Sequence, residues 1–377
     1  MRDARWQSLI ALLLATLLTA ACGGGAEEAG GEAEPSEPTQ EATADVATGG
    51  STEGPTEESD ATEAAAATDA PNPLAGETIT FVVGVGPGGG YDAYARLLAP
   101  FLGEQLDADV IVQNTPGAGG LLALNELLAA EADGTRIMLA NGSGVGGSAL
   151  AEAEGVQFEL DELAYVGRVY AGDKVVVTGT GSSYQTVQDL TGTGEPFTFG
   201  SSGPGASTYV EPTVLSEMLD WNATIITGFA GSAEINAAMV AGDVGGIMAD
   251  LDSELPLIEA GDARPLLLVG NDQAEAVPDT PTLLELELSA EQQDLAEALL
   301  ALLELGRVVV AHPDTPADAL EALRGAFERI LTDAEVVAAA QAQGRPIEYL
   351  SGAEVTEVVD TIQQAPPEFR EMLKAGY

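Results

Sequence analysis

Short apolar runs alternate with longer amphipathic stretches from residue 78 onward, and this alternation limits the fold more than any other feature of the sequence. Runs such as 78–83, 109–114 and 136–140 have the length of strands, and the stretches between them have the apolar period of helices. This order is typical of a parallel sheet with helices on both faces. The chain is therefore predicted to be an α/β protein.

The same rhythm returns in a second part of the chain. Further strands are predicted at 174–179, 196–202, 223–229, 244–250, 263–270 and 306–312. Helices are predicted near 206–219 and 232–241 and across 316–377. Because 304 residues follow position 73, two domains of ordinary size are expected. We predict a first domain of 75–178 plus 256–377 and a second of 179–255, with the two crossing segments as hinge.

The amino terminus has the pattern of a signal peptide. Arg2 and Arg5 precede an apolar run at 9–21, which is too short to span a bilayer and ends in small residues before Cys22. We therefore predict a signal peptide at 1–21. Cys22 is the only cysteine, so no internal disulfide can form, and LTAACGGG resembles the lipobox of bacterial lipoproteins. This resemblance implies lipidation of Cys22 and a membrane anchor; simple secretion is the alternative.

Acidic residues dominate the region that follows. Residues 23–73 contain 13 Asp and Glu and no basic or aromatic residue, so we predict a disordered acidic tether at 22–74. The whole chain has 13 basic and 61 acidic residues and a net charge of −48, which excludes nucleic acid as a partner. This acidity also suits a salty exterior, where charge is screened over short distances.

Four glycine-rich turns each follow a predicted strand and precede a predicted helix. They lie at 84–92, 114–120, 141–147 and 200–208. Glycine lets the backbone approach a ligand, and a helix N-terminus offers unpaired N–H groups. Because ligands of such folds collect at the carboxyl ends of strands, these turns are predicted to bind an anion. The alternative is that the glycines serve only close packing of strand and helix.

A dinucleotide-binding enzyme is a remote alternative. Gly84, Gly86 and Gly89 fit GxGxxG, but the second strand ends in Gln113 and Asn114 instead of the acidic residue that binds the ribose. We therefore predict no cofactor.

The sequence also lacks the residue patterns that other enzyme classes require. The single histidine, His312, is expected to be a surface or hinge residue, and GxSxG is absent. Metal-ligand clusters are absent from the sequence, and Asp250 and Asp252 lack the spacing of a calcium loop. We expect this acidic pair on a solvated face, and we predict no metal and no enzyme activity.

The motifs in their order carry a family resemblance. The first turn has a GG pair before Asp92, followed by Ala95 and Arg96. Further elements are NTPGAGG (114–120), DGT (133–135), SSGPGAS (201–207), PDTPT (278–282) and TP (315–316). Together they resemble the solute-binding receptors of tripartite tricarboxylate transporters, the Bug family. The resemblance implies a two-domain Venus-flytrap fold of the second periplasmic-binding class.

The resemblance also implies a function. Such a receptor captures a small carboxylate outside the cytoplasm and passes it to the membrane subunits of the transporter, and we expect it to be a monomer. The expected ligand-binding residues are Gly88, Gly89, Gly90, Tyr91, Asp92, Ser143, Ser202, Gly203, Gly205, Ala206, Ser207, Thr208, Phe229 and Asp250. A sensor or scaffold lipoprotein of the same fold remains an alternative.

Each expected site residue has a role. The backbone N–H groups of 88–92 and 202–207 clamp the carboxylate, and Asp92 orients its loop or accepts from a donor group of the ligand. Hydroxyl groups come from Ser143, Ser207 and Thr208. Tyr91 and Phe229 form apolar walls, and Asp250 is an acceptor in the second domain.

Three departures from the family pattern bear on the ligand. The usual histidine is replaced by Thr208 and Tyr209, the usual lysine by Ala230, and the usual tryptophan by a predicted helical insertion at 290–307. Without cationic partners, a mono- or dicarboxylate, or a ligand with an amino or hydroxyl group, is as well supported as a tricarboxylate.

Overall fold

The computed structural model describes residues 72–192 and 194–376, which belong to one compact unit, Thr68–Tyr377. The predicted signal peptide, Cys22 and most of the predicted tether lie outside the described residues. The last three tether residues are folded, because the Asn72 side chain donates to the Leu106 carbonyl oxygen and Leu74 is buried. The predicted end of the tether at residue 74 is therefore wrong.

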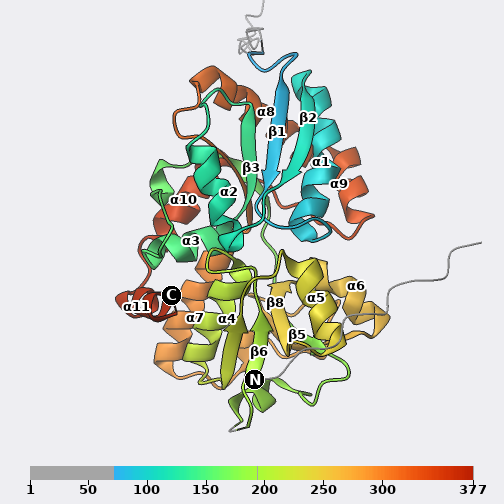
Figure 1. Cartoon of the computed structure of the whole chain (residues 1–377), viewed down its shortest axis with the longest axis vertical. Helices are drawn as coiled ribbons and strands as arrows, with labels where there is room; N and C mark the ends of the chain where they lie inside the picture. Colours follow the sequence, from blue (N-terminus) through green and yellow to red (C-terminus); the bar gives the residue numbers. More distant parts are fainter. Residues whose placement is uncertain (1–71, 193, 377) are drawn as a thin grey trace, which may run out of the picture. The chain divides into compact units, whose positions relative to one another are not determined.

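Two β-sheets form the framework of the described residues (Figure 1). The first has the strand order β11-β4-β10-β3-β1-β2, and the second has the order β7-β6-β8-β5-β9. The strands of the first sheet are β1 (Thr78–Val83), β2 (Asp109–Asn114), β3 (Arg136–Asn141), β4 (Ala164–Tyr170), β10 (Arg307–Ala311) and β11 (Leu350–Ser351). The strands of the second sheet are β5 (Lys174–Gly179), β6 (Phe197–Gly200), β7 (Ala223–Ile226), β8 (Gly246–Asp250) and β9 (Ala263–Val269).

Helices cover both sheets (Figure 1). The described α-helices are α1 (Gly90–Leu106), α2 (Leu121–Leu128), α3 (Gly142–Leu150), α4 (Ser207–Met218), α5 (Ser232–Ala241), α6 (Leu251–Ala260), α7 (Ala290–Leu303), α8 (Ala317–Thr332), α9 (Ala334–Gln341), α10 (Gly352–Ile362) and α11 (Pro367–Ala375). Short 3₁₀ turns are η1 (Ala118–Gly120), η2 (Leu160–Glu162), η3 (Val187–Thr191) and η4 (Leu283–Glu285). The predicted alternation of strands and helices is confirmed.

Parallel pairing places the glycine-rich turns at one edge of each sheet. β1 pairs in parallel with both β2 and β3, so the turns that follow these three strands share an edge. β6 pairs in parallel with β7 and β8, so the turn at 200–208 lies at the carboxyl edge of the second sheet. Antiparallel β10 completes the first sheet between β3 and β4.

The sheets divide the chain differently from the predicted domain boundaries. β5 and β9 pair with each other and belong to the second sheet, whereas the prediction placed nearly all of β5 and the whole of β9 in the first domain. The chain passes between the sheets at 171–173 and 270–306. A division into two domains remains a prediction, with these crossings as its better boundaries.

The predicted insertion at 290–307 contains helix α7, which contacts α3, α4 and α10. Its buried Leu295 and Leu299 belong to an apolar core cluster that also includes Val82 of the first sheet and Val176 of the second. α7 therefore packs in a core that includes residues of both sheets. Each large aliphatic side chain buried there contributes roughly 1.5–3 kcal/mol to stability.

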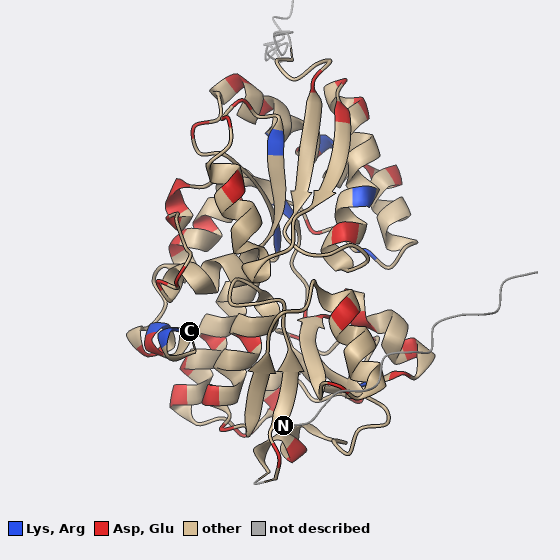
Figure 2. Cartoon of the chain, viewed as in Figure 1, with Lys and Arg blue, Asp and Glu red and all other residues tan. Residues whose placement is uncertain are grey.

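Acidic side chains are spread over the outer helices, whereas basic ones are few (Figure 2). Within 72–192 and 194–376, none of the helices combines the length and the apolar character needed to span a bilayer.

Candidate functional site

The glycine-rich turns of the two sheets touch through their backbones. The Gly119 N–H donates to the Ser202 carbonyl oxygen at 3.2 Å, and the Gly205 N–H donates to that of Ala118 at 3.1 Å. Glycine is required at 119, because its φ is +69° and a Cβ there would lie 2.2 Å from the Ala206 nitrogen. The turns therefore approach each other most closely where side chains are missing.

Helix α1 begins at the turn 84–92 and helix α4 at the turn 200–208, both with unpaired N–H groups. Gly89 is the N-cap of α1 and Ala206 that of α4, and neither makes a side-chain capping hydrogen bond. The backbone N–H groups of residues 90–92 and 207–208 have no acceptor in the described part of the chain. Such N–H groups and the helix dipole favour an anion. Each of these two N-termini therefore favours an anion, one on a helix of the first sheet and one on a helix of the second.

A cavity of about 10 Å³ lies beside the turns. Its lining residues come from the first sheet and its helices, and they are Gly84, Val85, Tyr91, Gly119, Gly120, Met138, Leu139, Asn141 and Val145. This volume accommodates about one water molecule. A carboxylate can therefore enter only while the turns are apart, and a closed form that holds it must leave more room here than this one does.

Asn141 lines the cavity and connects the two sheets, although the sequence analysis did not assign it to the site. Its Nδ2 donates to Ser207 Oγ at 2.8 Å, and its Oδ1 accepts from the Gly144 N–H at 2.9 Å. Asn is a preferred N-cap residue, so its place before the predicted helix was the available signal. Both ends of this side chain are occupied by protein partners.

Asp92 is held by its own loop. Its carboxylate accepts from the Gly88 N–H at 2.9 Å and pairs with Arg96 at 2.9 Å. Burial raises the pKa of this carboxyl, but the hydrogen bonds from Arg96 and Gly88 outweigh burial, so the pKa is lowered. Of the two predicted roles, this geometry favours orienting the loop over accepting from a ligand.

In the turn at 84–92, which we call the first loop, Gly89 and Gly90 lie against helices of the second sheet. A Cβ at Gly89 would lie 2.7 Å from Ser232 Oγ, and one at Gly90 would lie 2.3 Å from Ser253 Oγ. Glycine at these two positions therefore permits close contact between α1 and helices α5 and α6.

The predicted hydroxyl groups have protein partners. Ser143 Oγ donates to Glu211 Oε1 at 2.7 Å, and Thr208 Oγ1 lies 3.2 Å from Ser201 Oγ. Ser207 accepts from Asn141. The turn at 202–206 is ordered by its own bonds, since the Ala206 N–H donates to the Gly203 carbonyl oxygen. Binding of a ligand by these residues remains a prediction.

The structure does not place Phe229 at the cavity. Phe229 packs against the apolar cluster of Val175 and Ile235 in the second sheet, and it is absent from the cavity lining. The neighbouring Ala230 carbonyl oxygen accepts from the Gly86 N–H at 2.6 Å. The segment therefore touches the first loop through its backbone.

Buried charges lie at the crossing between the sheets. Lys174 Nζ is 2.7 Å from Asp250 and 3.3 Å from Glu211. Arg307 Nη2 is 3.0 Å from both Asp250 and Asp252. All five side chains are buried, so the expectation of a solvated acidic face for Asp250 and Asp252 is wrong. The cations of β5 and β10 compensate these acids and make their burial possible.

Burial and pairing shift the pKa values in this cluster in different directions. Burial lowers the pKa of Lys174, but Asp250 and Glu211 outweigh it, and the pKa is raised. Burial raises the pKa of Asp250, but Arg307 and Lys174 outweigh it, and the pKa is lowered. For Glu211, burial raises the pKa more than Lys174 lowers it. Glu211 is therefore easier to protonate than Asp250.

Tyrosine rings enclose the guanidinium of Arg307. Its Cζ lies 4.6 Å from the ring centroid of Tyr94, 5.2 Å from that of Tyr91 and 5.3 Å from that of Tyr170. Such cation–π contacts offset part of the free-energy cost of removing the guanidinium from water.

Sequence reasoning missed Lys174, Glu211 and Arg307. Lys174 and Arg307 each stand directly before a Val-Val-Val strand in a chain with only 13 basic residues. That repeated pattern was the available signal.

His312, predicted to be a surface or hinge residue, is half-buried directly after β10 and outside both crossings between the sheets. Its Nδ1 accepts from the Asp314 N–H at 3.0 Å, and its Nε2 lies 3.0 Å from the Leu128 carbonyl oxygen. Both ring nitrogens are therefore engaged within the fold.

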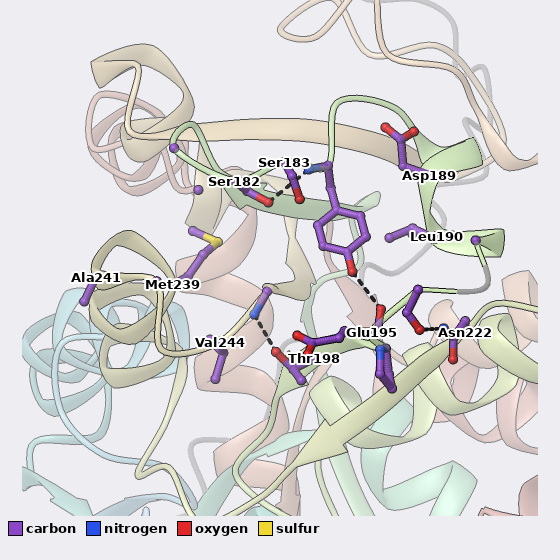
Figure 3. A pocket seen from close by; sticks show the side chains of 18 of the residues that line it. Ser182, Ser183, Asp189, Leu190, Glu195, Thr198, Asn222, Met239, Ala241 and Val244 are labelled. Atoms are coloured by element: carbon purple, nitrogen blue, oxygen red, sulfur yellow. Dashed lines mark hydrogen bonds between the residues drawn. The ribbon is translucent and has the colours of Figure 1, made fainter.

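A larger cavity of about 850 Å³ lies elsewhere (Figure 3). Its lining includes Thr198 near the start of β6, the end of α5, and Ser182 and Asn222. Thr198 Oγ1 accepts from the Gly245 N–H, and the Asn222 side chain donates to the Gly194 carbonyl oxygen. This cavity is at the end of β6 opposite the glycine-rich turn at 200–208. The side chains of Thr198 and Asn222 are hydrogen-bonded to backbone groups of the same lining.

Comparison with known proteins identifies the family. Residues 94–357 match the model of the tripartite tricarboxylate transporter family receptor. BugT of Bordetella pertussis is 26% identical over 215 residues, which cover 55% of this chain and 65% of BugT. The chain thus spans slightly less than two thirds of that relative.

Solved structures share the fold. MatC from Rhodopseudomonas palustris, with bound malate, is 19% identical and has a TM-score of 0.66 over 79% of this chain and 99% of its own. An R. palustris protein with adipate is 19% identical and has a TM-score of 0.64 over 80% of this chain and 97% of its own. The predicted periplasmic-binding-protein fold is confirmed. With most of its folded part matched by the family model, this chain belongs to the tripartite tricarboxylate transporter receptor family.

Proposed function

We propose that this chain is an extracytoplasmic receptor that binds a small carboxylate between its two sheets and delivers it to membrane subunits of a transporter. One observation carries the proposal. The N-termini of α1 and α4, which belong to different sheets, present unpaired N–H groups at the turns 84–92 and 200–208, and both of these turns contact the turn at 114–120. A carboxylate has two oxygens and can accept from both helices at once.

The comparisons support a carboxylate as ligand. MatC was solved with malate and the second R. palustris protein with adipate, and both share this fold. The replacement of the family's usual lysine by Ala230 leaves the backbone N–H groups as the main anion-binding donors. A mono- or dicarboxylate fits this donor set better than a ligand with three charges.

Binding is expected to be coupled to closure. The two crossings at 171–173 and 270–306 would act as hinges, and the ligand would favour the closed form because only that form brings both helices to it. The small cavity volume and the backbone bonds between the turns imply that the turns first separate to admit the ligand.

Anchoring and partners complete the proposal. Lipidation of Cys22 would hold the receptor at the membrane, and the acidic tether would let it reach the transporter. We expect a monomer with no enzyme activity, since the proposed role needs only reversible binding. A sensor role would use the same site with a different membrane partner.

A ligand screen by thermal shift tests the function. The purified protein is heated with mono-, di- and tricarboxylates, amino acids, aromatic acids and NAD. Saturable stabilisation by a carboxylate, which follows mass action, would support the proposal. A shift with NAD alone would support a dinucleotide-binding protein instead, and a folded protein without any response would overturn the proposed function.

A further inference from the structure

Three side chains, of which only Tyr91 lines the cavity, have buried polar atoms without a hydrogen-bond partner in the described residues. These atoms are the Tyr91 hydroxyl, Glu211 Oε2, and Nε and Nη1 of Arg307. Glu211 and Arg307 are both 0% exposed. A buried polar atom without a partner costs about 1–3 kcal/mol, so several of them in one place call for a specific explanation.

The three side chains belong to one connected cluster. Glu211 contacts Lys174, Lys174 contacts Asp250, and Asp250 contacts Arg307. Arg307 lies over the ring of Tyr91. The charges of Asp250, Lys174, Arg307 and Glu211 all act on the Tyr91 hydroxyl. The unpartnered atoms therefore belong to side chains of one connected cluster.

Tyr91 connects this cluster to the cavity. It lines the cavity, and Asn141, the other polar side chain there, uses both ends for protein bonds. Ser143, two residues after Asn141, donates to Glu211 Oε1, so Oε2 is the oxygen without a partner. Tyr91 was predicted to form an apolar wall, but it is the polar residue of the cavity lining whose side chain has no hydrogen-bond partner among the described residues.

The chemistry of the unpartnered atoms selects the group that would fit among them. Arg307 offers N–H donors, Glu211 offers an acceptor, and Tyr91 can serve as either. A carboxylate would satisfy Arg307 but repel the Glu211 carboxylate. An ammonium group would satisfy Glu211 but repel Arg307. A hydroxyl group accepts from Arg307 or Tyr91 and donates to Glu211, so it satisfies both.

We propose that the ligand is a hydroxy acid, whose hydroxyl group is recognised by Tyr91, Glu211 and Arg307 while the helix N-termini hold its carboxylate. This inference rests on the proposed function and adds the class of ligand. The carboxylate of Asp92, the other residue predicted to accept from a donor group of the ligand, already accepts from Gly88 and Arg96.

Matched pairs of acids test the inference by isothermal titration calorimetry. The probes are malate against succinate and lactate against propionate, each hydroxy acid as both enantiomers, with aspartate as the amino analogue of malate. A hydroxyl group bonded to a charged partner should improve Kd by about tenfold or more. We expect one hydroxy acid to bind at least tenfold more tightly than its partner without the hydroxyl.

Tyr91→Phe removes the hydroxyl and keeps the ring over Arg307. It should bring the ratio of the two dissociation constants close to one by weakening the hydroxy acid alone. Tyr94→Phe is the matched control on the same helix, because the Tyr94 hydroxyl donates to the Pro346 carbonyl oxygen at 2.7 Å. It should leave the ratio unchanged.

The outcomes separate this inference from the function on which it rests. Equal binding within each pair, or tightest binding of aspartate, would overturn the hydroxy-acid inference and leave the carboxylate receptor standing. Loss of preference in Tyr94→Phe but not in Tyr91→Phe would overturn the assigned role of Tyr91. Absence of saturable binding for all these acids would overturn both proposals.

Discussion

The Nζ of Lys174 lies 2.7 Å from Oδ1 of Asp250, and these two residues are direct partners in the pairing of β5 with β8. The register of the two strands thus places both residues of the ion pair directly opposite each other. Glu211 of α4 then lies 3.3 Å from the same ammonium group, so one cation serves two acids. Removing this cation would leave both acids buried with less compensation.

Lys174→Met should lower the free energy of unfolding by about 3–5 kcal/mol, the usual cost of leaving a buried charge unpaired. Urea denaturation followed by circular dichroism measures this change. Lys374→Met is the control, because Lys374 pairs with Glu152 at an exposed position, and it should have no measurable effect. The double variant Lys174→Met/Glu211→Leu should recover part of the loss. Equal effects of the two single lysine variants would contradict the prediction.

Glu254 should make the stability depend on pH. Burial raises its pKa to about 7, and Asn236, which donates to its Oε1 at 3.1 Å, opposes this shift. The folded state therefore holds a proton that the unfolded state has lost, and stability falls as pH rises from about 4.5 to 7. The shift corresponds to about 3 kcal/mol.

Glu254→Gln mimics the protonated acid and should remove this part of the pH dependence. The difference in unfolding free energy between wild type and variant should change by about 3 kcal/mol between pH 4.5 and pH 8, with the variant gaining as pH rises. Glu259→Gln, an exposed position on the same helix, is the control. Parallel pH profiles for wild type and Glu254→Gln would refute the prediction.

Gly119→Ala should prevent the turns from closing. A Cβ at this position would lie 2.2 Å from the Ala206 nitrogen, and the φ of +69° is unfavourable for alanine. We expect a larger radius of gyration in small-angle X-ray scattering and at least tenfold weaker ligand binding, because about 1.4 kcal/mol of closure energy is enough for that. Gly181→Ala is the control, since its Cβ would meet no atom within 4 Å. Unchanged affinity in Gly119→Ala would mean that closure at this contact is not needed.

Asp92→Asn should destabilise the first loop near neutral pH by about 1 kcal/mol or less, because the paired Arg96 is mostly exposed. Bonds from Arg96 and Gly88 overcome burial and lower the Asp92 pKa, so its contribution is present above the ordinary aspartate range and is lost as pH falls through the lowered value. Thermal melts should therefore separate the two proteins at pH 7 and converge in strong acid. A constant difference at all pH values would argue against the charge of Asp92 as its cause.

Ligand affinity should rise, or at least stay level, when salt is added. The chain carries a net charge of −48, so an anionic ligand approaches against the overall field, and salt screens that repulsion. The unpaired N–H groups of 90–92 and 207–208 act at short range and are screened less. Titrations between low and moderate ionic strength measure this dependence, and a steep loss of affinity with salt would contradict a backbone-based site.

The sequence predicted those features that depend on local pattern. The strands predicted at 78–83, 109–114 and 136–140 follow from short apolar runs, and the turns at 84–92 and 200–208 follow from their glycines. The order of the motifs predicted the family. The helix in the insertion at 290–307 followed from its apolar period.

Features that depend on the pairing of strands distant in the chain could not be predicted from the sequence. Lys174 and Asp250 are 76 residues apart, and only the pairing of β5 with β8 brings them together. For the same reason Asp252 was expected in solvent although Arg307, on a strand of the other sheet, binds it. The placement of β5 and β9 in one sheet follows from long-range contacts that no local pattern carries.

Burial of Lys174 also has a practical consequence for labelling. The chain has two lysines, and the side chain of Lys174 is 1% exposed whereas that of Lys374 is 37% exposed. In the folded state an amine-reactive dye should therefore attach to Lys374 and, where it is free, to the terminal amine. Lys374 lies on α11, which contacts α3, α4 and α7, helices associated with different sheets. A fluorophore at this position would report relative movement of the sheets without any engineered cysteine.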